Sequence, residues 1–123
     1  MVSARTTIIS VGADAELVRL RNFVLQDAGF DVISTIDAHV ALARIERGDC
    51  GVLLMCYSLE KSVRQQLADA LRKFCPNSRI VAITNQQIDR PDFADSFVYG
   101  VEGPEVLIDV VSAAVEKSQS AEA

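Results

Sequence analysis

The sequence is short of the residues that build metal and disulfide sites. It has one histidine, His39, and three cysteines, Cys50, Cys56 and Cys75, none of them in a CxxC pair. This spacing gives no zinc site. Residues 1–7 lack the apolar core of a signal peptide, and an odd number of cysteines without such a leader predicts reduced thiols in the cytoplasm.

Long apolar runs and basic clusters are also missing. No stretch approaches the roughly 20 apolar residues that span a bilayer, so we expect no membrane contact. The net charge is −5 without a basic cluster, which disfavours direct nucleic-acid binding. What is present is a globular balance, with 50% hydrophobic residues over 123 positions. This predicts one domain over residues 1–123, with a core at about 6–117 and a frayed tail at 118–123.

Short apolar segments alternate with amphipathic ones along the chain. Strands are expected at residues 6–11, 31–35, 51–56, 79–84 and 96–99. Between them lie helices that Asp14 and Asp37 cap and that Gly29 and Gly48 end, a helix at residues 62–74, and a last helix beginning at Pro104. In the first helix, the predicted buried face is Leu17, Leu20, Val24 and Ala28; in the third helix it is Val63, Leu67, Ala70, Leu71 and Phe74.

This alternation predicts an α/β fold with a parallel sheet between two layers of helices. Five strands favour the flavodoxin-like order 2-1-3-4-5, in which a ligand sits at the carboxyl ends of strands 1 and 3. Only eleven residues, 85–95, separate the fourth and fifth expected strands. We therefore predict that the fourth helix of the fold is very short or absent and that Asp92 and Asp95 are solvated.

Three segments carry a motif resemblance: Ile-Ile-Ser-Val at 8–11, Leu-Leu-Met-Cys-Tyr-Ser-Leu at 53–59 and Ile-Val-Ala-Ile-Thr at 80–84. Together they resemble the CheY-like receiver domain of bacterial response regulators, over roughly residues 6–117. The resemblance implies a degenerate site: Gly12, Ala13 and Asp14 at the acidic pocket, Cys56 at the phospho-accepting aspartate, Thr84 as the retained hydroxyl, Phe97 as the switch aromatic and Gly100 at the lost lysine.

These replacements remove the chemistry of phosphoryl transfer. Mg²⁺ needs hard oxygen ligands, which Gly12 and Ala13 lack, and the sulfur of Cys56 is a soft ligand. We therefore expect no Mg²⁺, no other cofactor, no enzymatic activity and no ordinary aspartate phosphorylation. No cation that would activate Cys56 is identifiable from the sequence, so a buried apolar thiol is the favoured interpretation. Thr84 reads most simply as a strand-end hydroxyl satisfied locally, Phe97 as a packing residue and His39 as a solvated side chain.

Three functions remain open at this stage. The favoured one is a pseudo-receiver of two-component (phosphorelay) signalling that works through protein–protein interaction in the cytoplasm. Its expected partner is a histidine kinase, an output protein or a second copy, bound through the first helix, the last helix or the edge of the fifth strand. The alternatives are a conventional phospho-responsive receiver and a thiol redox sensor or enzyme that uses Cys56.

Overall fold

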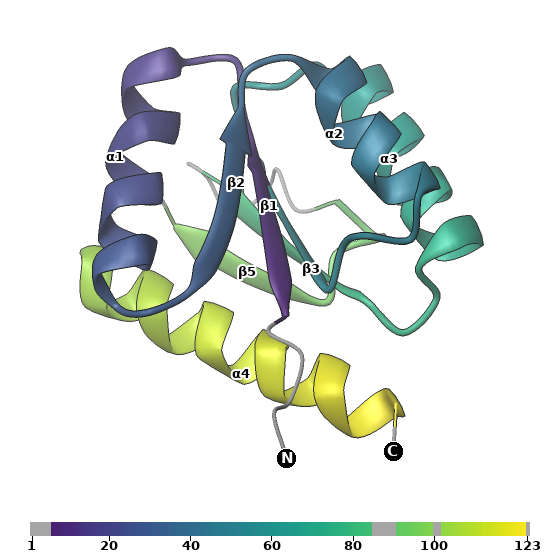
Figure 1. Cartoon of the computed structure of the whole chain (residues 1–123). Coiled ribbons are helices and arrows are strands. Elements are labelled where there is room, and N and C mark those ends of the chain that lie inside the picture. Colours follow the sequence, from purple (N-terminus) through teal and green to yellow (C-terminus); the bar gives the residue numbers. More distant parts are fainter. Residues whose placement is uncertain (1–5, 85–90, 100–101, 123) are drawn as a thin grey trace.

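The computed structural model describes residues 6–84, 91–99 and 102–122. One parallel sheet contains β1 (Thr7–Val11), β2 (Asp31–Thr35), β3 (Val52–Cys56), β4 (Arg79–Thr84) and β5 (Ser96–Tyr99). Its strand order is β2-β1-β3-β4-β5 (Figure 1). The predicted flavodoxin-like order 2-1-3-4-5 is therefore confirmed.

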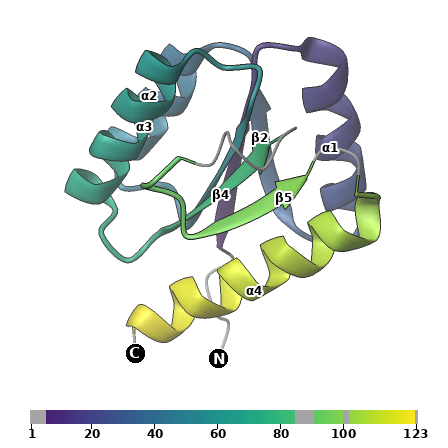
Figure 2. The same ribbon diagram turned by 180° about the vertical axis from the view of Figure 1, so that it is seen from behind.

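The helices form a layer on each side of this sheet. They are α1 (Ala15–Asp27), α2 (Ala38–Glu46), α3 (Lys61–Phe74) and α4 (Pro104–Glu122). Helices α2 and α3 cover one face, and α1 and α4 cover the other, as both views show (Figures 1 and 2). In the part of the chain described, no helix is long and apolar enough to cross a membrane.

The core is divided by the sheet into two clusters. Strand β3 lies at the centre and all five of its residues are buried, which explains its unbroken apolar run. Successive side chains of a strand point to opposite faces. The cluster under α2 and α3 includes Ile9, Leu53, Met55, Ile45, Leu67 and Leu71. The cluster under α1 and α4 includes Ile8, Leu54, Ile83, Leu25, Leu107 and Val111.

The predicted helix boundaries follow from local chemistry. The carboxylates of Asp14 and Asp37 accept backbone N–H groups at the starts of α1 and α2. Gly29 and Gly48 have φ of 96° and 76°, so the chain leaves both helices through a left-handed residue that glycine adopts without steric cost.

The described part of the connection between β4 and β5 is held by an aspartate. Its described residues, 91–95, form turns, consistent with the predicted loss of a full helix here. Asp92 and Asp95 are exposed, as expected, but the carboxylate of Asp95 also makes specific hydrogen bonds. Its Oδ2 accepts hydrogen bonds from the Ile80 N–H at 2.8 Å and from Arg72 Nη2 at 2.9 Å, and its own N–H donates to the Ile80 carbonyl. The carboxylate thus fixes the entry to β5.

Three smaller expectations need correction. The buried residues of α1 are Val18 and Leu25, whereas the predicted inner residue Leu20 is 60% exposed. Phe74 of α3 is also exposed, and Lys73 Nζ lies over its ring, 5.2 Å from the centroid. Helix α4 continues to Glu122 and buries Ser118, which corrects the expectation of fraying for residues 118–122.

Candidate functional site

The carboxyl ends of β1 and β3 bring Gly12 and Cys56 together. Val11 and Met55 are register partners, so the residues that follow them meet at the same edge of the sheet. Both Gly12 and Cys56 are buried, and Cys56 is only 2% exposed. The resemblance assigns the acidic pocket and the phospho-acceptor to this edge.

Packing at this edge is tight around position 12. A Cβ added to Gly12 would lie 3.0 Å from Cys56 Cβ, 3.0 Å from Val18 Cγ2 and 3.4 Å from Ser58 Oγ. The first two distances are shorter than ordinary carbon–carbon contacts, which lie near 3.5–4.0 Å. A side chain at position 12 would therefore require β3 or α1 to shift by a few tenths of an ångström.

A hydrogen bond joins the two loops above this edge. The Ala13 N–H donates to Ser58 Oγ at 2.9 Å, which links the loop after β1 to the loop after β3. Sequence reasoning missed this role of Ser58. Its position two residues after Cys56 was the available signal, because serine hydroxyls commonly bind loop backbone.

Asp14 serves the helix rather than a metal. Its Oδ1 accepts the N–H groups of Glu16 at 3.1 Å and Leu17 at 3.3 Å, as an N-cap does. No cluster of three or more His, Cys, Asp or Glu side chains suited to a metal ion occurs among the described residues. The lone carboxylate at this edge is thus occupied by two donors.

Thr84 and Phe97 lie further along the sheet. Thr84 is fully buried at the end of β4, and its Oγ1 has no hydrogen-bond partner within the described residues. Phe97 is half-buried in β5, in register with Ala82. The structure therefore does not engage the Thr84 hydroxyl with Cys56. Gly100, assigned to the lost lysine, lies outside the described residues.

A cation contacts Cys56, contrary to what the sequence suggested. Arg21 Nη1 of α1 donates to Cys56 Sγ at 3.1 Å. Arg21 lies among the apolar residues of α1 and three positions after Val18, so helical spacing directs both toward the sheet. That spacing was the missed signal.

The other two thiols lie elsewhere in the core, near the amino ends of β3 and β4. Burial raises the pKa of the Cys50 thiol far above its ordinary value, and Cys75 and Asp49 add to this effect. Burial also raises the pKa of Cys75. Both thiols are thus neutral hydrophobic groups in the folded protein, as expected for structural cysteines. His39 is exposed, as predicted.

Comparison by sequence and comparison by structure have different outcomes for this chain. No protein family and no curated protein matches the sequence. Solved structures do match. A CheY-like response regulator receiver domain protein from Methanospirillum hungatei has a TM-score of 0.82 at 18% identity, covering 95% of this chain and 98% of that one.

Two further receiver structures agree with this match. The response regulator TrrA from Thermotoga maritima, solved in complex with Mg²⁺-BeF, has a TM-score of 0.76 at 18% identity over 89% of this chain and 98% of that one. The chemotaxis protein CheY4 from Vibrio cholerae has a TM-score of 0.76 at 18% identity over 90% and 99%. The chain therefore has the receiver fold.

Proposed function

We propose that this chain is a phosphorylation-independent interaction module of two-component signalling, without enzymatic activity, that works in the cytoplasm. The receiver fold supports the signalling context, since structurally similar chains are response regulators. The closed edge at Gly12 and Cys56 supports independence from phosphorylation. One observation carries the proposal: this edge presents Gly12, Ala13 and Cys56 in tight packing, and the nearby carboxylate of Asp14 caps α1.

The chemistry of the site supports the same proposal. In phosphoryl transfer, Mg²⁺ and a lysine or arginine offset charge on the transferring group. Here the carboxylate of Asp14 caps α1, and Cys56 supplies a thiol in place of the accepting oxygen. Neither residue provides the hard-oxygen metal site that the reaction needs.

The direct test uses beryllofluoride, which mimics the bound phosphoryl group. Purified protein is titrated with Mg²⁺ and beryllofluoride while backbone amide NMR shifts are recorded, with the Thermotoga maritima TrrA as positive control because its structure holds Mg²⁺-BeF. We expect no saturable shifts at Gly12, Ala13 or Cys56. Saturable shifts there would overturn the proposal in favour of a phospho-responsive receiver.

The proposed partner surface is the exposed side of α1. Leu20 and Phe23 are 60% and 68% exposed and lie three residues apart, so they share one side of the helix. Exposed apolar side chains that adjoin one another mark interaction sites more often than isolated ones do. The first partner to test is a second copy of the chain.

Two phenylalanine variants give a matched test of this surface. Sedimentation velocity is measured for the wild type, Phe23→Ser and Phe74→Ser, since Phe74 is an exposed aromatic on the opposite layer. We expect Phe23→Ser to abolish self-association and Phe74→Ser to preserve it. Equal effects of both variants would exclude the α1 surface, and a monomeric wild type would exclude a second copy as partner.

Thiol chemistry at Cys56 is the second candidate, because Arg21 donates to its sulfur. Its burial argues against reaction with external reagents, since only 2% of Cys56 is exposed. We expect iodoacetamide to leave Cys56 unmodified in the native protein and to modify it after urea unfolding. Selective native modification, located by mass spectrometry, would favour the thiol function.

A further inference from the structure

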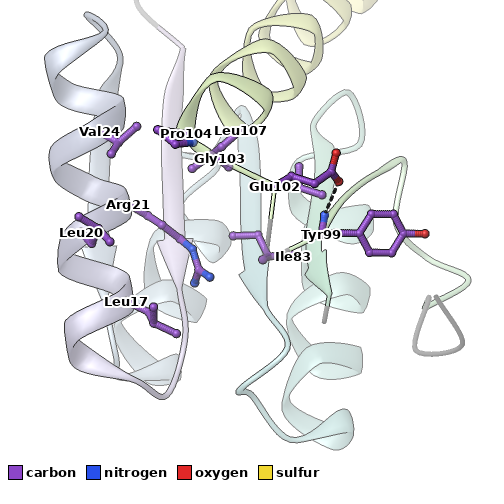
Figure 3. A pocket seen from close by; sticks show the side chains of 11 residues that line it. Leu17, Leu20, Arg21, Val24, Ile83, Tyr99, Glu102, Gly103, Pro104 and Leu107 are labelled. Atoms are coloured by element: carbon purple, nitrogen blue, oxygen red, sulfur yellow. Dashed lines mark hydrogen bonds between the residues drawn. The ribbon is translucent and has the colours of Figure 1, made fainter. Parts of the chain in front are cut away.

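A pocket of about 220 Å³ lies between α1, the carboxyl ends of β4 and β5, and the start of α4 (Figure 3). Its walls are mainly apolar. Those from α1 are Leu17, Leu20 and Val24, and those from the other elements include Ile83, Val98 and Leu107. Leu17, Leu20 and Val24 are the residues whose spacing predicted a buried face, yet none of them is fully buried. They line open space instead.

Among the described residues that line the pocket, Arg21 is the one cation. Figure 3 shows its side chain directed from α1 into the space beside Ile83. Its partner is the Cys56 sulfur, and a thiol is a weak, uncharged acceptor. Within the described residues Arg21 forms no ion pair, so its charge is not neutralised by a neighbouring carboxylate.

Glu102 lies on the other side of the pocket and restricts its ligands. Its Oε1 accepts the Tyr99 N–H at 2.9 Å, which holds the carboxylate away from the guanidinium in Figure 3. This negative charge in the wall, opposite Arg21, disfavours ligands that carry two anionic groups. The pocket therefore combines apolar walls, one available cation and a repulsive charge opposite it.

We propose that this pocket binds a small apolar monocarboxylate, with the carboxylate on Arg21 and the hydrocarbon part against Leu107 and Val24. A charge-assisted bond from guanidinium to carboxylate is stronger than the present bond to sulfur. A dry cavity of about 150 Å³ accommodates benzene, so 220 Å³ suits roughly nine non-hydrogen atoms by proportion. The inference does not depend on the proposed function, because it uses neither the closed edge nor a protein partner.

The experiment uses phenylacetate, which has the expected size and charge, and its neutral analogue phenylacetamide. Each is titrated into isotopically labelled protein while amide shifts are recorded. We expect saturable shifts at Val24, Ile83, Val98 and Leu107 with phenylacetate, and binding at least about tenfold weaker with the amide, the ratio expected from losing one charged hydrogen bond. Cys56 should also shift, because its sulfur loses the Arg21 donor.

Two arginine variants on the same helix provide the control. Arg21→Gln should weaken phenylacetate binding by about tenfold and leave amide binding unchanged. Arg19→Gln makes the same change in net charge at an exposed position and should leave both unchanged. If Arg21→Gln fails to fold, Leu20→Ser gives a second test, since Leu20 is largely exposed yet lines the pocket and its loss should weaken both ligands.

Three results would overturn the inference. The first is the absence of saturation with phenylacetate up to about 10 mM, which corresponds to binding weaker than about −3 kcal/mol. The second is equal affinity for phenylacetate and phenylacetamide. The third is equal effects of Arg19→Gln and Arg21→Gln on phenylacetate binding. Saturable beryllofluoride binding would contradict the proposed function alone and would leave the pocket's ligand unaffected.

Discussion

Two neighbouring regions beside α1 differ in how tightly their side chains are packed. At the carboxyl edge of β1 and β3, Gly12, Cys56 and Val18 are packed so closely that an added methyl group would require its neighbours to shift by a few tenths of an ångström. Further along the same helix, Leu17, Leu20 and Val24 stand apart from β5 and α4 and leave about 220 Å³ open. Arg21 borders both regions. Tight packing has thus removed space from the edge where the fold usually holds ligands, and the space that remains is apolar.

Restoring an acid at the closed edge should have the largest effect. Gly12→Asp adds atoms to a filled site and buries a carboxylate, so we expect a loss of about 4 kcal/mol in the free energy of unfolding, from overpacking together with desolvation. Ala13→Asp puts the same charge on the exposed neighbouring residue and should change stability by less than about 1 kcal/mol. Urea unfolding measures both, and a stable Gly12→Asp protein would show that the edge is open.

The two walls of the pocket should differ in their contribution to stability. Leu107 is 6% exposed and belongs to the core, so Leu107→Ala should destabilise the protein by about 2–3 kcal/mol. Leu20 is 60% exposed, and Leu20→Ala should change stability by less than about 0.5 kcal/mol. Similar losses in the two variants would mean that the pocket is closed in solution and that Leu20 is packed.

The raised pKa of the buried Cys50 thiol predicts how the stability of the protein depends on pH. Because the pKa of Cys50 is raised by folding, its proton is lost first from the unfolded chain, at about pH 8.5. Stability should be constant below that pH and fall above it by about 1.4 kcal/mol per pH unit for this thiol. Cys50→Ala should reduce the slope measured by urea unfolding between pH 8 and 10; an unchanged slope would contradict the burial effect.

The smallest expected effect on stability concerns Asp14, and it distinguishes a helix-capping role of this carboxylate from a metal-binding role. Asp14→Ala should cost about 1 kcal/mol, because two N–H groups of α1 lose their acceptor. Asp14→Ser keeps a capping oxygen and should recover most of that loss. Thermal unfolding with and without Mg²⁺ should give the same midpoint for all three proteins; a rise with Mg²⁺ in the wild type alone would identify Asp14 as a ligand.

The sequence specified the sheet better than it specified the site. Strand order, the caps at Asp14 and Asp37 and the short interval before β5 depend on local chemistry or on apolar runs, and each was predictable. The exposure of the apolar side of α1 was not predictable. Apolar residues at helical spacing indicate that a helix has an apolar face, but they do not show whether another element covers that face. For this reason Leu20 was predicted to be buried.

Contacts between distant residues escaped prediction for the same reason. The bond from Arg21 to Cys56 joins positions 35 residues apart, and the bond from Ala13 to Ser58 joins positions 45 apart. Local spacing indicates that Arg21 faces the sheet and that Ser58 lies in the loop after β3, but it does not identify the distant partner of either residue. The closure at Gly12 was visible only as a missing acid, because a glycine in a sequence does not reveal which atoms occupy the space beside it.

The hydrogen bonds of Asp95 have a consequence for the position of β5. Because Asp95 binds Ile80 through both its backbone and its carboxylate, and Arg72 through the carboxylate, the start of β5 is positioned independently of the chain that precedes it. The position of β5, and of the pocket wall that it forms, therefore depends on Asp95 itself.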